Sequence, residues 1–387
     1  MTIFVSAGEP SGDLHGANFA RAVRSLNDSA RMVGFGGDRM SAAGVDLIFP
    51  LTRLSVMWLS RSIVNLPKFF DLADQAERVF RSGQIDAVVL IDFPGFHWHL
   101  AKRAKAAGVP VYYFVPPQLW AWGGWRTRKM RKNFDTILTA LPFEDVWFRR
   151  KGLKTRYVGH PYFDELAAQR PDPGFVTSAR SAGPVVALLP GSRNQEVASN
   201  VPLMLATAAK IHAARPDVRF LVASFNERQR DAAKALTVNA GLPIEFHVGL
   251  TPEIIAAADV CLAVSGSVGL ELMYRGVPSA IVYRYSRFAR FVARRLMTCK
   301  YISLVNLLAD EELFPEFLTD GDCSSAMADR LLGWLNDPAA HAATKSKLLA
   351  LRDRVAVPGA SGRAAEFVLG RIAESGSSAP AAVRKIA

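Results

Sequence analysis

The sequence predicts an α/β protein made of two doubly wound domains that face each other across a cleft. Short apolar runs typical of buried parallel strands alternate with helical patterns along both halves of the chain. With 387 residues, the chain is long enough for two domains of ordinary size. In each half, loops rich in small and polar residues directly follow apolar runs, which is where open α/β sheets bind their ligands.

The first strand is expected at Thr2 to Ser6, followed by the loop SAGEPSGD and the start of a helix. This loop lacks the GxGxxG pattern of dinucleotide sites. Carboxylates suit sugar hydroxyls or proton transfer better than phosphate, so Glu9 and Asp13 are candidate catalytic acids. Alternatively, both acids complement the positive end of the helix dipole.

Residues 53–72 combine apolar bulk with several cations. Such a segment can lie in a membrane interface or hold acyl chains, because its apolar side chains become buried while its cations meet lipid phosphates. Alternatively, it is a core helix that covers the sheet. The side chains predicted to contact a membrane or acyl chains are Met57, Trp58, Leu59, Ile63 and Phe69.

Asp92 ends a buried strand in the stretch DAVVLIDFPGF and is the leading candidate for a catalytic base. Burial at the mouth of an apolar strand raises the pKa of a carboxyl group toward that of a useful base. Alternatively, its carboxylate accepts backbone N–H bonds. His97 and His99 have the spacing of a zinc pair on a strand, but no third ligand follows at a suitable distance, so we expect no metal.

A tryptophan-rich segment follows the strand expected at Val111 to Val115. Trp120, Trp122 and Trp125 precede a run of cations, a combination that can stack bases and bind phosphates. The same cations also fit one solvated face of a helix, and we expect no nucleic-acid partner.

The second half opens with VVALLPGSRNQEV at residues 185–197, after a Pro-, Gly- and Ser-rich linker expected at 170–183. Gly191 lets a ligand approach the backbone, Ser192 can cap a helix, and Arg193 can bind a phosphate bidentately. We therefore predict a diphosphate site here, although an ordinary turn with a surface arginine fits the same letters. A separate helix is expected from Pro202 to Ala214.

A second small-residue loop, SGSVGLE, follows the strand expected at Val260 to Val264. It opens a helix and can bind an anion through backbone N–H groups. Glu271 in the first turns of that helix can accept bonds from ribose hydroxyls, or it is a surface acid near the dipole. The loop residues predicted to bind substrate are Ser265, Gly266 and Ser267.

Composition limits the class of protein further. The net charge of +12 favours an anionic partner, which can be a nucleotide, a nucleic acid or an anionic membrane surface. Three widely spaced cysteines indicate neither a disulfide framework nor a zinc cluster, which fits a reducing cytoplasm. The chain enters a strand at once, so no signal peptide is expected, and no run is apolar for long enough to span a bilayer.

Taken in order, the motifs resemble those of lipid-A-disaccharide synthases, from about residue 2 to residue 370. This family is a GT-B type of inverting glycosyltransferase with two Rossmann-like domains. The motifs are SAGEPSGD, VGFGGDRM at Val33 to Met40, IDFPGF, WAW, LPFE at Leu141 to Glu144, VGHP, LLPGSR, SGSVGLE and SLVNLL at Ser303 to Leu308.

The resemblance implies transfer of 2,3-diacylglucosamine from UDP-2,3-diacylglucosamine to the 6-hydroxyl of 2,3-diacylglucosamine 1-phosphate. The products are the β-1,6-linked disaccharide 1-phosphate and UDP, and no cofactor is implied. Asp92 matches the family's proposed base, while Arg193, Glu271 and Asn306 match positions that hold UDP. Family members also contact the cytoplasmic surface of the inner membrane peripherally, and they often form homodimers by exchanging C-terminal parts.

The expected division of the chain follows from these matches. Residues 1–169 form an acceptor and base domain with the membrane-contacting segment 53–72, and residues 184–374 form a UDP-sugar domain. The helix expected at Pro358 to Ala373 packs back toward the N-terminal domain, and residues 375–387 form a disordered tail.

Two alternatives remain open at this point. One is another GT-B enzyme, either an epimerase or a UDP-sugar transferase with a different acceptor. The other is a basic, non-enzymatic protein that binds anionic polymers. The family commonly has Asp-Ala-Pro-Asp where this chain has Asp92-Phe93-Pro94-Gly95, and in this chain Arg61 interrupts the apolar segment.

Overall fold

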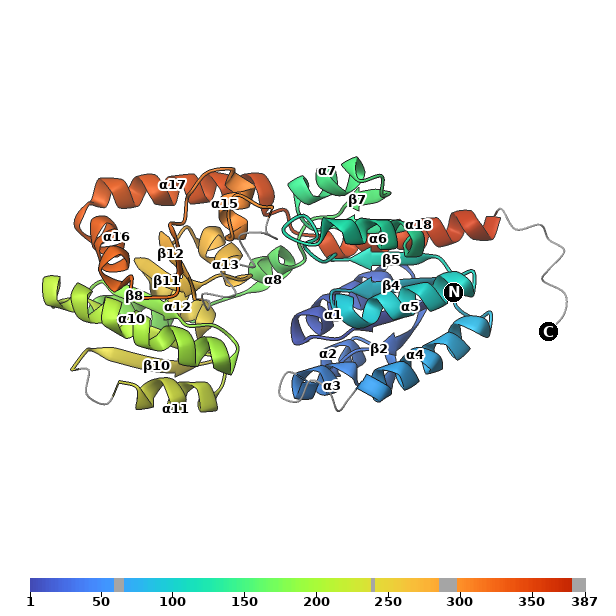
Figure 1. Cartoon of the computed structure of the whole chain (residues 1–387), viewed down its shortest axis with the longest axis horizontal. Helices are drawn as coiled ribbons and strands as arrows, with labels where there is room; N and C mark the ends of the chain where they lie inside the picture. Colours follow the sequence, from blue (N-terminus) through green and yellow to red (C-terminus); the bar gives the residue numbers. More distant parts are fainter. Residues whose placement is uncertain (59–65, 238–240, 285–297, 378–387) are drawn as a thin grey trace. The chain divides into compact units, whose positions relative to one another are not determined.

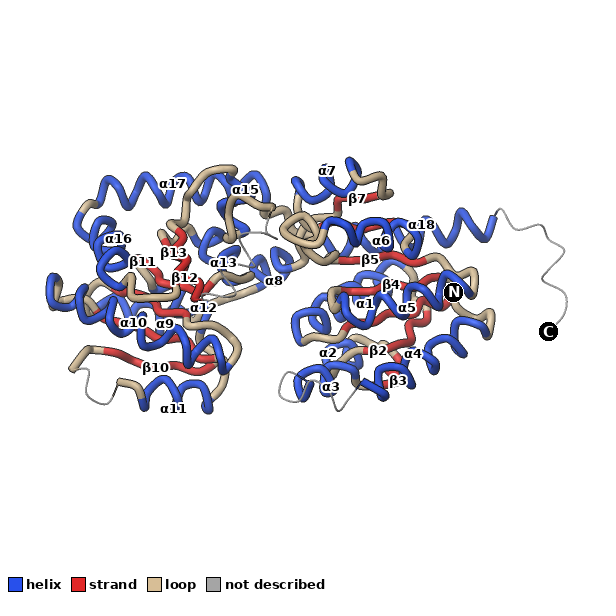
Figure 2. The backbone as a smooth tube through the Cα atoms, in the orientation of Figure 1, coloured by secondary structure: helices blue, strands red, loops and turns tan. Residues whose placement is uncertain are grey.

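The computed structural model describes residues 1–58, 66–237, 241–284 and 298–377. It divides into two compact units (Figure 1). Unit 1 combines Met1–Ala167 with the C-terminal part from Val357 onward, and unit 2 is Ala168–Ala356. Each unit is a parallel sheet with helices on both faces (Figure 2), which confirms the predicted class of two doubly wound α/β domains.

Unit 1 contains a parallel sheet of seven strands in the order β3-β2-β1-β4-β5-β6-β7. The strand order reverses between β1 and β4, so this pair marks the switch point of the sheet. The strands are β1 (Thr2–Ala7), β2 (Arg31–Phe35), β3 (Asp46–Phe49), β4 (Ala87–Ile91), β5 (Val111–Phe114), β6 (Thr136–Thr139) and β7 (Thr155–Tyr157).

Helices cover both faces of this sheet, so both faces are buried. Successive strand residues point to opposite faces. Phe4, Val88 and Leu90 pack on one face, while Val89 and Ile91 pack on the other. The first face is covered by α3 (Leu51–Trp58), α4 (Leu66–Arg81), α5 (Pro94–Ala106), α6 (Thr127–Asn133) and α7 (Pro142–Arg150), and the second by α1 (Pro10–Leu26), α2 (Asp38–Ala42) and α18 (Ala360–Ser377).

Helix α18 returns to unit 1 and packs against α1. Its buried Ala364, Ala365 and Val368 join the core of the second face, as the predicted docking of the C-terminal helix requires. The second unit therefore ends at Ala356 rather than at residue 374, because the apolar face of α18 is buried in unit 1. Residues 375–377 of the predicted tail belong to this helix, and residues 378–387 lie outside the described residues.

Unit 2 contains a second parallel sheet, of six strands in the order β10-β9-β8-β11-β12-β13. Its order reverses between β8 and β11, which repeats the switch point of unit 1. The strands are β8 (Val185–Leu189), β9 (Arg219–Ser224), β10 (Ile244–Val248), β11 (Val260–Val264), β12 (Ser279–Arg284) and β13 (Glu316–Thr319).

Two predictions for this part of the chain were wrong, one of a linker and one of a separate helix. The expected linker contains α9 (Pro173–Ser181): Asp172 accepts the Gly174 N–H at 2.8 Å, so the Asp-Pro pair is a cap and a first helical turn rather than a break. The expected separate helix from Pro202 is part of α10 (Asn194–Ala214), which carries the proline in its interior.

The other described helices of unit 2 are α11 (Glu227–Ala235), α12 (Thr251–Ala257), α13 (Val268–Arg275), α15 (Leu304–Ala309), α16 (Ser324–Asn336) and α17 (Pro338–Val355).

Asp164 in α8 (Tyr162–Ala168) attaches α18 to unit 1. Its carboxylate accepts backbone N–H bonds from Gly359 at 2.6 Å and from Ala360 and Ser361 at 3.1 Å. These N–H groups lie at the start of α18, where a helix has no internal acceptors for them.

We expect Asp164→Ala to destabilise unit 1 by about 1–2 kcal/mol, because three N–H groups lose their acceptor. Thermal unfolding followed by circular dichroism measures the effect as a lower midpoint. Glu366→Ala changes an exposed acid on the same helix and serves as the control. Equal midpoints for the two variants would contradict the capping role.

Candidate active site

The acids predicted in unit 1 lie at the carboxyl ends of β1 and β4, on either side of the switch point. The register pairs Ala7 with Ile91, so Glu9 and Asp92 follow neighbouring strand ends. A Cβ atom on Gly8 would lie 2.2 Å from the ring of Phe93, which shows how closely the two loops approach. The structure thus brings Glu9 and Asp92 together.

Asp92 has an unusual backbone and an unusual charge environment. Asp92 and Phe93 have φ values of 53° and 50°, in the left-handed region that side chains other than glycine rarely adopt. Burial, and after it the charge of Glu9, raise the pKa of the Asp92 carboxyl to about 6, against a smaller opposing effect of a backbone hydrogen bond from Phe93. This carboxyl group therefore titrates close to neutrality, as a general base requires.

The carbonyl oxygen of Asp92 accepts two side-chain hydrogen bonds. The Tyr113 hydroxyl donates to it at 3.0 Å, and His97 Nδ1 lies 2.6 Å away. Because a carbonyl oxygen can only accept, His97 carries its proton on Nδ1. Burial lowers the pKa of His97 to about 3, so the ring is neutral, and its Nε2 accepts from the Ser6 hydroxyl at 2.9 Å. His97 lies in helix α5, not on a strand as the zinc-pair interpretation assumed.

Asp13, the third candidate acid, is buried and has internal partners. Its carboxylate accepts backbone N–H bonds from Gly37 at 2.7 Å, Arg39 at 3.1 Å and Met40 at 3.2 Å. These bonds satisfy the first turn of α2. The geometry favours a structural role for Asp13, whereas Asp92 and Glu9 are partly exposed at the carboxyl ends of their strands.

Glu144 is a buried acid that sequence reasoning did not single out as a site residue. Its carboxylate accepts bonds from Trp120 Nε1 at 3.1 Å and from the Ala140 N–H at 3.0 Å. Burial is the largest cause of its pKa rising to about 7. Glu144 follows β6 and thereby fixes the tryptophan-rich segment near the carboxyl edge of the unit 1 sheet.

In unit 2, the PGSR loop (Pro190–Arg193) follows β8 at the switch point. Arg193, not Ser192 as predicted, occupies the N-cap position of α10, and the Glu196 carboxylate at the third helical position accepts its backbone N–H. The Glu196 carboxylate accepts the N–H groups of Ser192 at 3.1 Å and Arg193 at 3.2 Å. The backbone donors expected to be free for a diphosphate thus already contact a carboxylate, beside Gly191 with its φ of 115°.

The Arg193 guanidinium remains accessible. Its side chain is 63% exposed, and Nη1 lies 3.2 Å from Glu196 Oε1. An ion pair with one well-exposed partner contributes little to stability.

The SGSVGLE loop follows β11, the neighbour of β8, so both predicted UDP loops share one edge of the unit 2 sheet. Gly266 and Ser267 are exposed, Ser265 is partly buried, and α13 begins at Val268. Glu271 is buried, and its Oε1 lies 3.2 Å from Arg275 Nε. This pair holds the Glu271 carboxylate in a fixed position.

Asn306, also predicted to bind UDP, is fully buried in α15. Its oxygen accepts the N–H groups of Leu313 and Phe314, and its nitrogen donates to the Phe314 carbonyl and to Glu316. Two lone pairs and two protons are thereby all used. The amide supports the loop that follows α15 and has no bonding position left for a ligand.

The predicted membrane residues are only partly described. Leu59 and Ile63 lie outside the described residues, and Met57 and Trp58 end helix α3. Phe69 in α4 packs against Phe96, with ring centroids 5.3 Å apart, and against Phe93 at 6.2 Å. Within the described part of the chain, no helix has the length and apolarity needed to cross a membrane.

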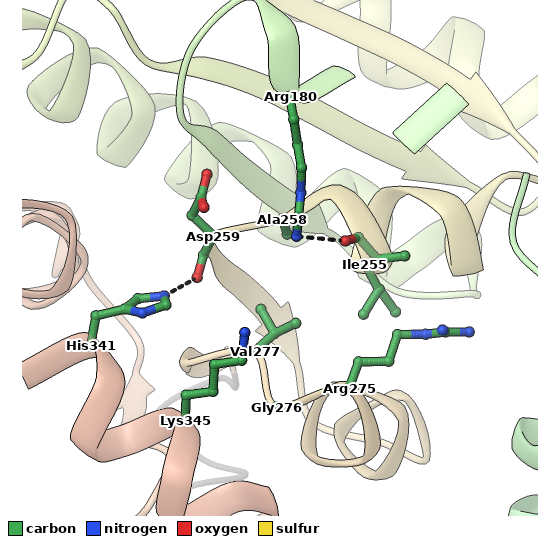
Figure 3. Close-up of a pocket in the computed structure, with 10 residues that line it drawn as sticks. Arg180, Ile255, Ala258, Asp259, Arg275, Gly276, Val277, His341 and Lys345 are labelled. Carbon is green, nitrogen blue, oxygen red and sulfur yellow. Dashed lines mark hydrogen bonds between the residues drawn. The ribbon is translucent and has the colours of Figure 1, made fainter. Parts of the chain in front are cut away.

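A polar pocket in unit 2 lies at the opposite, amino-terminal edge of its sheet (Figure 3). Asp259 directly precedes β11, and His341 Nε2 donates to the Asp259 carbonyl at 2.9 Å. Arg180 donates to the carbonyls of Ala256 and Ala257 at the end of α12, at 2.9 and 3.2 Å. The Arg180 guanidinium thereby satisfies carbonyl groups at the C-terminus of α12.

Solved structures share this fold. The S. aureus MnaA–UDP co-structure matches with a TM-score of 0.66 at 11% identity, covering 96% of this chain and 97% of that chain. CalG4, the calicheamicin glycosyltransferase, matches with a TM-score of 0.59 at 14% identity, covering 96% and 99%. Identities this low establish similarity of fold alone.

Sequence comparison resolves the family. A model of the lipid-A-disaccharide synthetase family matches residues 3–353. The lipid-A-disaccharide synthase of Anaeromyxobacter dehalogenans is 35% identical over 381 residues, covering 95% of this chain and 97% of the relative. That of Alkalilimnicola ehrlichii is 35% identical over 384 residues, covering 97% and 100%. The chain therefore belongs to the lipid-A-disaccharide synthase family of glycosyltransferases.

Proposed function

We propose that this chain is a hexosyltransferase that moves 2,3-diacylglucosamine from its UDP conjugate to the 6-hydroxyl of 2,3-diacylglucosamine 1-phosphate. The products are the β-1,6-linked disaccharide 1-phosphate and UDP, with inversion at the anomeric carbon. Family membership supports the reaction. The structural observation that carries it is Asp92, a carboxyl group of raised pKa at the switch point of unit 1.

The direct test is mass spectrometry of the products formed by purified protein from the two acylated sugars. A disaccharide 1-phosphate that appears in step with UDP is the expected result. Conversion of a UDP-sugar into its epimer, with no disaccharide, would instead favour an epimerase.

In the proposed mechanism, Asp92 takes the proton of the acceptor's 6-hydroxyl as that oxygen attacks the anomeric carbon. The bond between this carbon and the UDP oxygen breaks, and its electron pair leaves with UDP. Proton uptake neutralises a carboxylate that burial and Glu9 disfavour, so the local electrostatics assist the step.

Unit 2 supplies the groups that we propose hold UDP. The diphosphate replaces the Glu196 carboxylate at the N–H groups of Ser192 and Arg193, with the Arg193 guanidinium alongside. The SGSVGLE loop contributes further N–H groups, and Glu271 accepts bonds from the ribose hydroxyls. Asn306 acts indirectly, by supporting the loop after α15.

We expect Arg193→Ala to weaken UDP binding about 30-fold, since a charge-assisted contact with diphosphate contributes about 2 kcal/mol. Isothermal titration calorimetry with UDP measures the change. Arg228→Ala removes an exposed arginine of α11 in the same unit and should bind UDP normally. Unchanged affinity in a folded Arg193 variant would remove this side chain from the site.

We expect Asp92→Asn to lower kcat by about 10² to 10⁴, because the amide keeps the shape of the side chain and cannot accept the proton. UDP affinity, a property of unit 2, should stay close to that of the parent. Turnover within a few-fold of the parent would transfer the role of base to Glu9.

The same assignment determines the pH dependence. Since the raised pKa of Asp92 is about 6, kcat/KM should rise as pH increases through about 6 and stay high above it. With a carboxylate of ordinary pKa, the midpoint of this rise would lie near pH 4. The residual activity of the Asn variant should lack the step near pH 6.

We also propose peripheral contact of residues 53–72 with the cytoplasmic surface of the inner membrane. Phe70 of α4 is 50% exposed, beside the packed Phe69, and several cations accompany this segment.

Changing Trp58 and Phe70 together to Ser should reduce flotation with vesicles, most strongly when these contain anionic lipid. Phe225→Ser is the matched control, because that phenylalanine is 68% exposed in unit 2. Equal flotation of both variants and the parent would return residues 53–72 to the core-helix interpretation.

A further inference from the structure

We propose that His97 is a positioning residue of the transfer reaction: together with Tyr113, it holds the strained backbone of Asp92 in the conformation that directs the carboxylate toward the acceptor. The inference rests on the proposed role of Asp92 as the base. It adds two side chains that do not touch the reacting atoms.

The backbone at Asp92 needs such support. Two consecutive residues, Asp92 and Phe93, adopt left-handed φ values, although neither is glycine. This conformation costs free energy at each residue and persists only where the surroundings enforce it. It lies between the last residue of β4, Ile91, and the first residue of α5, Pro94, so it sets the direction in which the Asp92 side chain leaves the sheet.

Hydrogen bonds fix both ends of the Asp92 backbone. Its N–H donates to the Phe114 carbonyl at 3.2 Å, and its carbonyl accepts from His97 Nδ1 at 2.6 Å and from the Tyr113 hydroxyl at 3.0 Å. The two side-chain donors come from helix α5 and strand β5 and use both lone pairs of the oxygen. The residue can therefore not rotate toward ordinary strand geometry without breaking bonds in a buried site.

His97 is itself fixed. It is fully buried, and Ser6 on β1 donates to its Nε2 at 2.9 Å. Its ring also contacts the rings of Phe93 and Tyr113, with centroids 5.8 and 6.3 Å apart. With both nitrogens bonded inside the protein, His97 has no position for a substrate or a metal ion. It connects β1, β4 and β5 at the switch point.

Two substitutions test the roles of the two His97 nitrogens separately. The amide of Asn reaches about as far as Nδ1 and can keep the donor to the Asp92 carbonyl. The amide of Gln reaches about as far as Nε2 and keeps the Ser6 contact but loses that donor. A positioning role predicts that His97→Gln lowers kcat about 100-fold while His97→Asn loses less than tenfold, with the KM for the UDP-sugar unchanged in both.

Matched controls lie next to both residues. His99→Gln alters the exposed histidine of the same helix and should leave kcat unchanged. Tyr113→Phe should lower kcat about fivefold, as expected for loss of one hydrogen bond, whereas Tyr112→Phe on the same strand should not. In the Asp92→Asn background, adding His97→Gln should slow the residual reaction no further, because His97 acts through Asp92.

The outcomes separate this inference from the proposed function. Equal kcat for the Asn and Gln variants, or a lowered unfolding midpoint of His97→Gln with parental kcat, would assign His97 to fold stability alone and overturn the inference. Full activity of Asp92→Asn would instead overturn the proposed base. Additive losses in the double variant would show that His97 does not act through Asp92.

Discussion

The reversal of strand order at one point in each sheet is the constraint on which both candidate sites depend. Where neighbouring parallel strands send their helices to opposite faces, the two loops diverge and leave the carboxyl edge open. In unit 1, this happens between β1 and β4 and brings Glu9 beside Asp92; in unit 2, it happens between β8 and β11 and brings the PGSR loop beside the SGSVGLE loop. The loops of both sites follow buried apolar strands, and these strands fix where the loops begin.

Local patterns predicted much of this arrangement. Runs such as VVALL were recognisable as strands because both faces of a doubly wound sheet are buried, and the loop that follows each run lies at the carboxyl edge of the sheet. Local patterns failed where one signal has two meanings. Asp172-Pro173 resembles a break in the chain and is a helix start, and Pro202 resembles a helix start and lies inside a helix.

Contacts between residues distant in sequence were beyond prediction. Nothing near Asp13 in the sequence indicates that its carboxylate binds the backbone of residues 37–40, and nothing near His97 indicates Ser6 as its partner. Such contacts determine which of several similar acids have internal partners. The sequence therefore predicted a set of acids, and the packing of α1, α2 and α5 distinguishes the members with structural partners from Asp92.

The two candidate sites differ in their electrostatics. In unit 2, the Glu196 carboxylate accepts the N–H groups of Ser192 and Arg193. In the mechanism that we propose, the diphosphate takes the place of this carboxylate. In unit 1, burial and Glu9 leave the Asp92 carboxylate in an unfavourable environment, and protonation relieves it. A loop whose N–H groups already have an acceptor suits reversible binding of a product such as UDP. A carboxylate whose charge is disfavoured by its surroundings suits the uptake of a proton. The two halves of a displacement reaction thus require different electrostatics, and separate sheets allow each to be set independently.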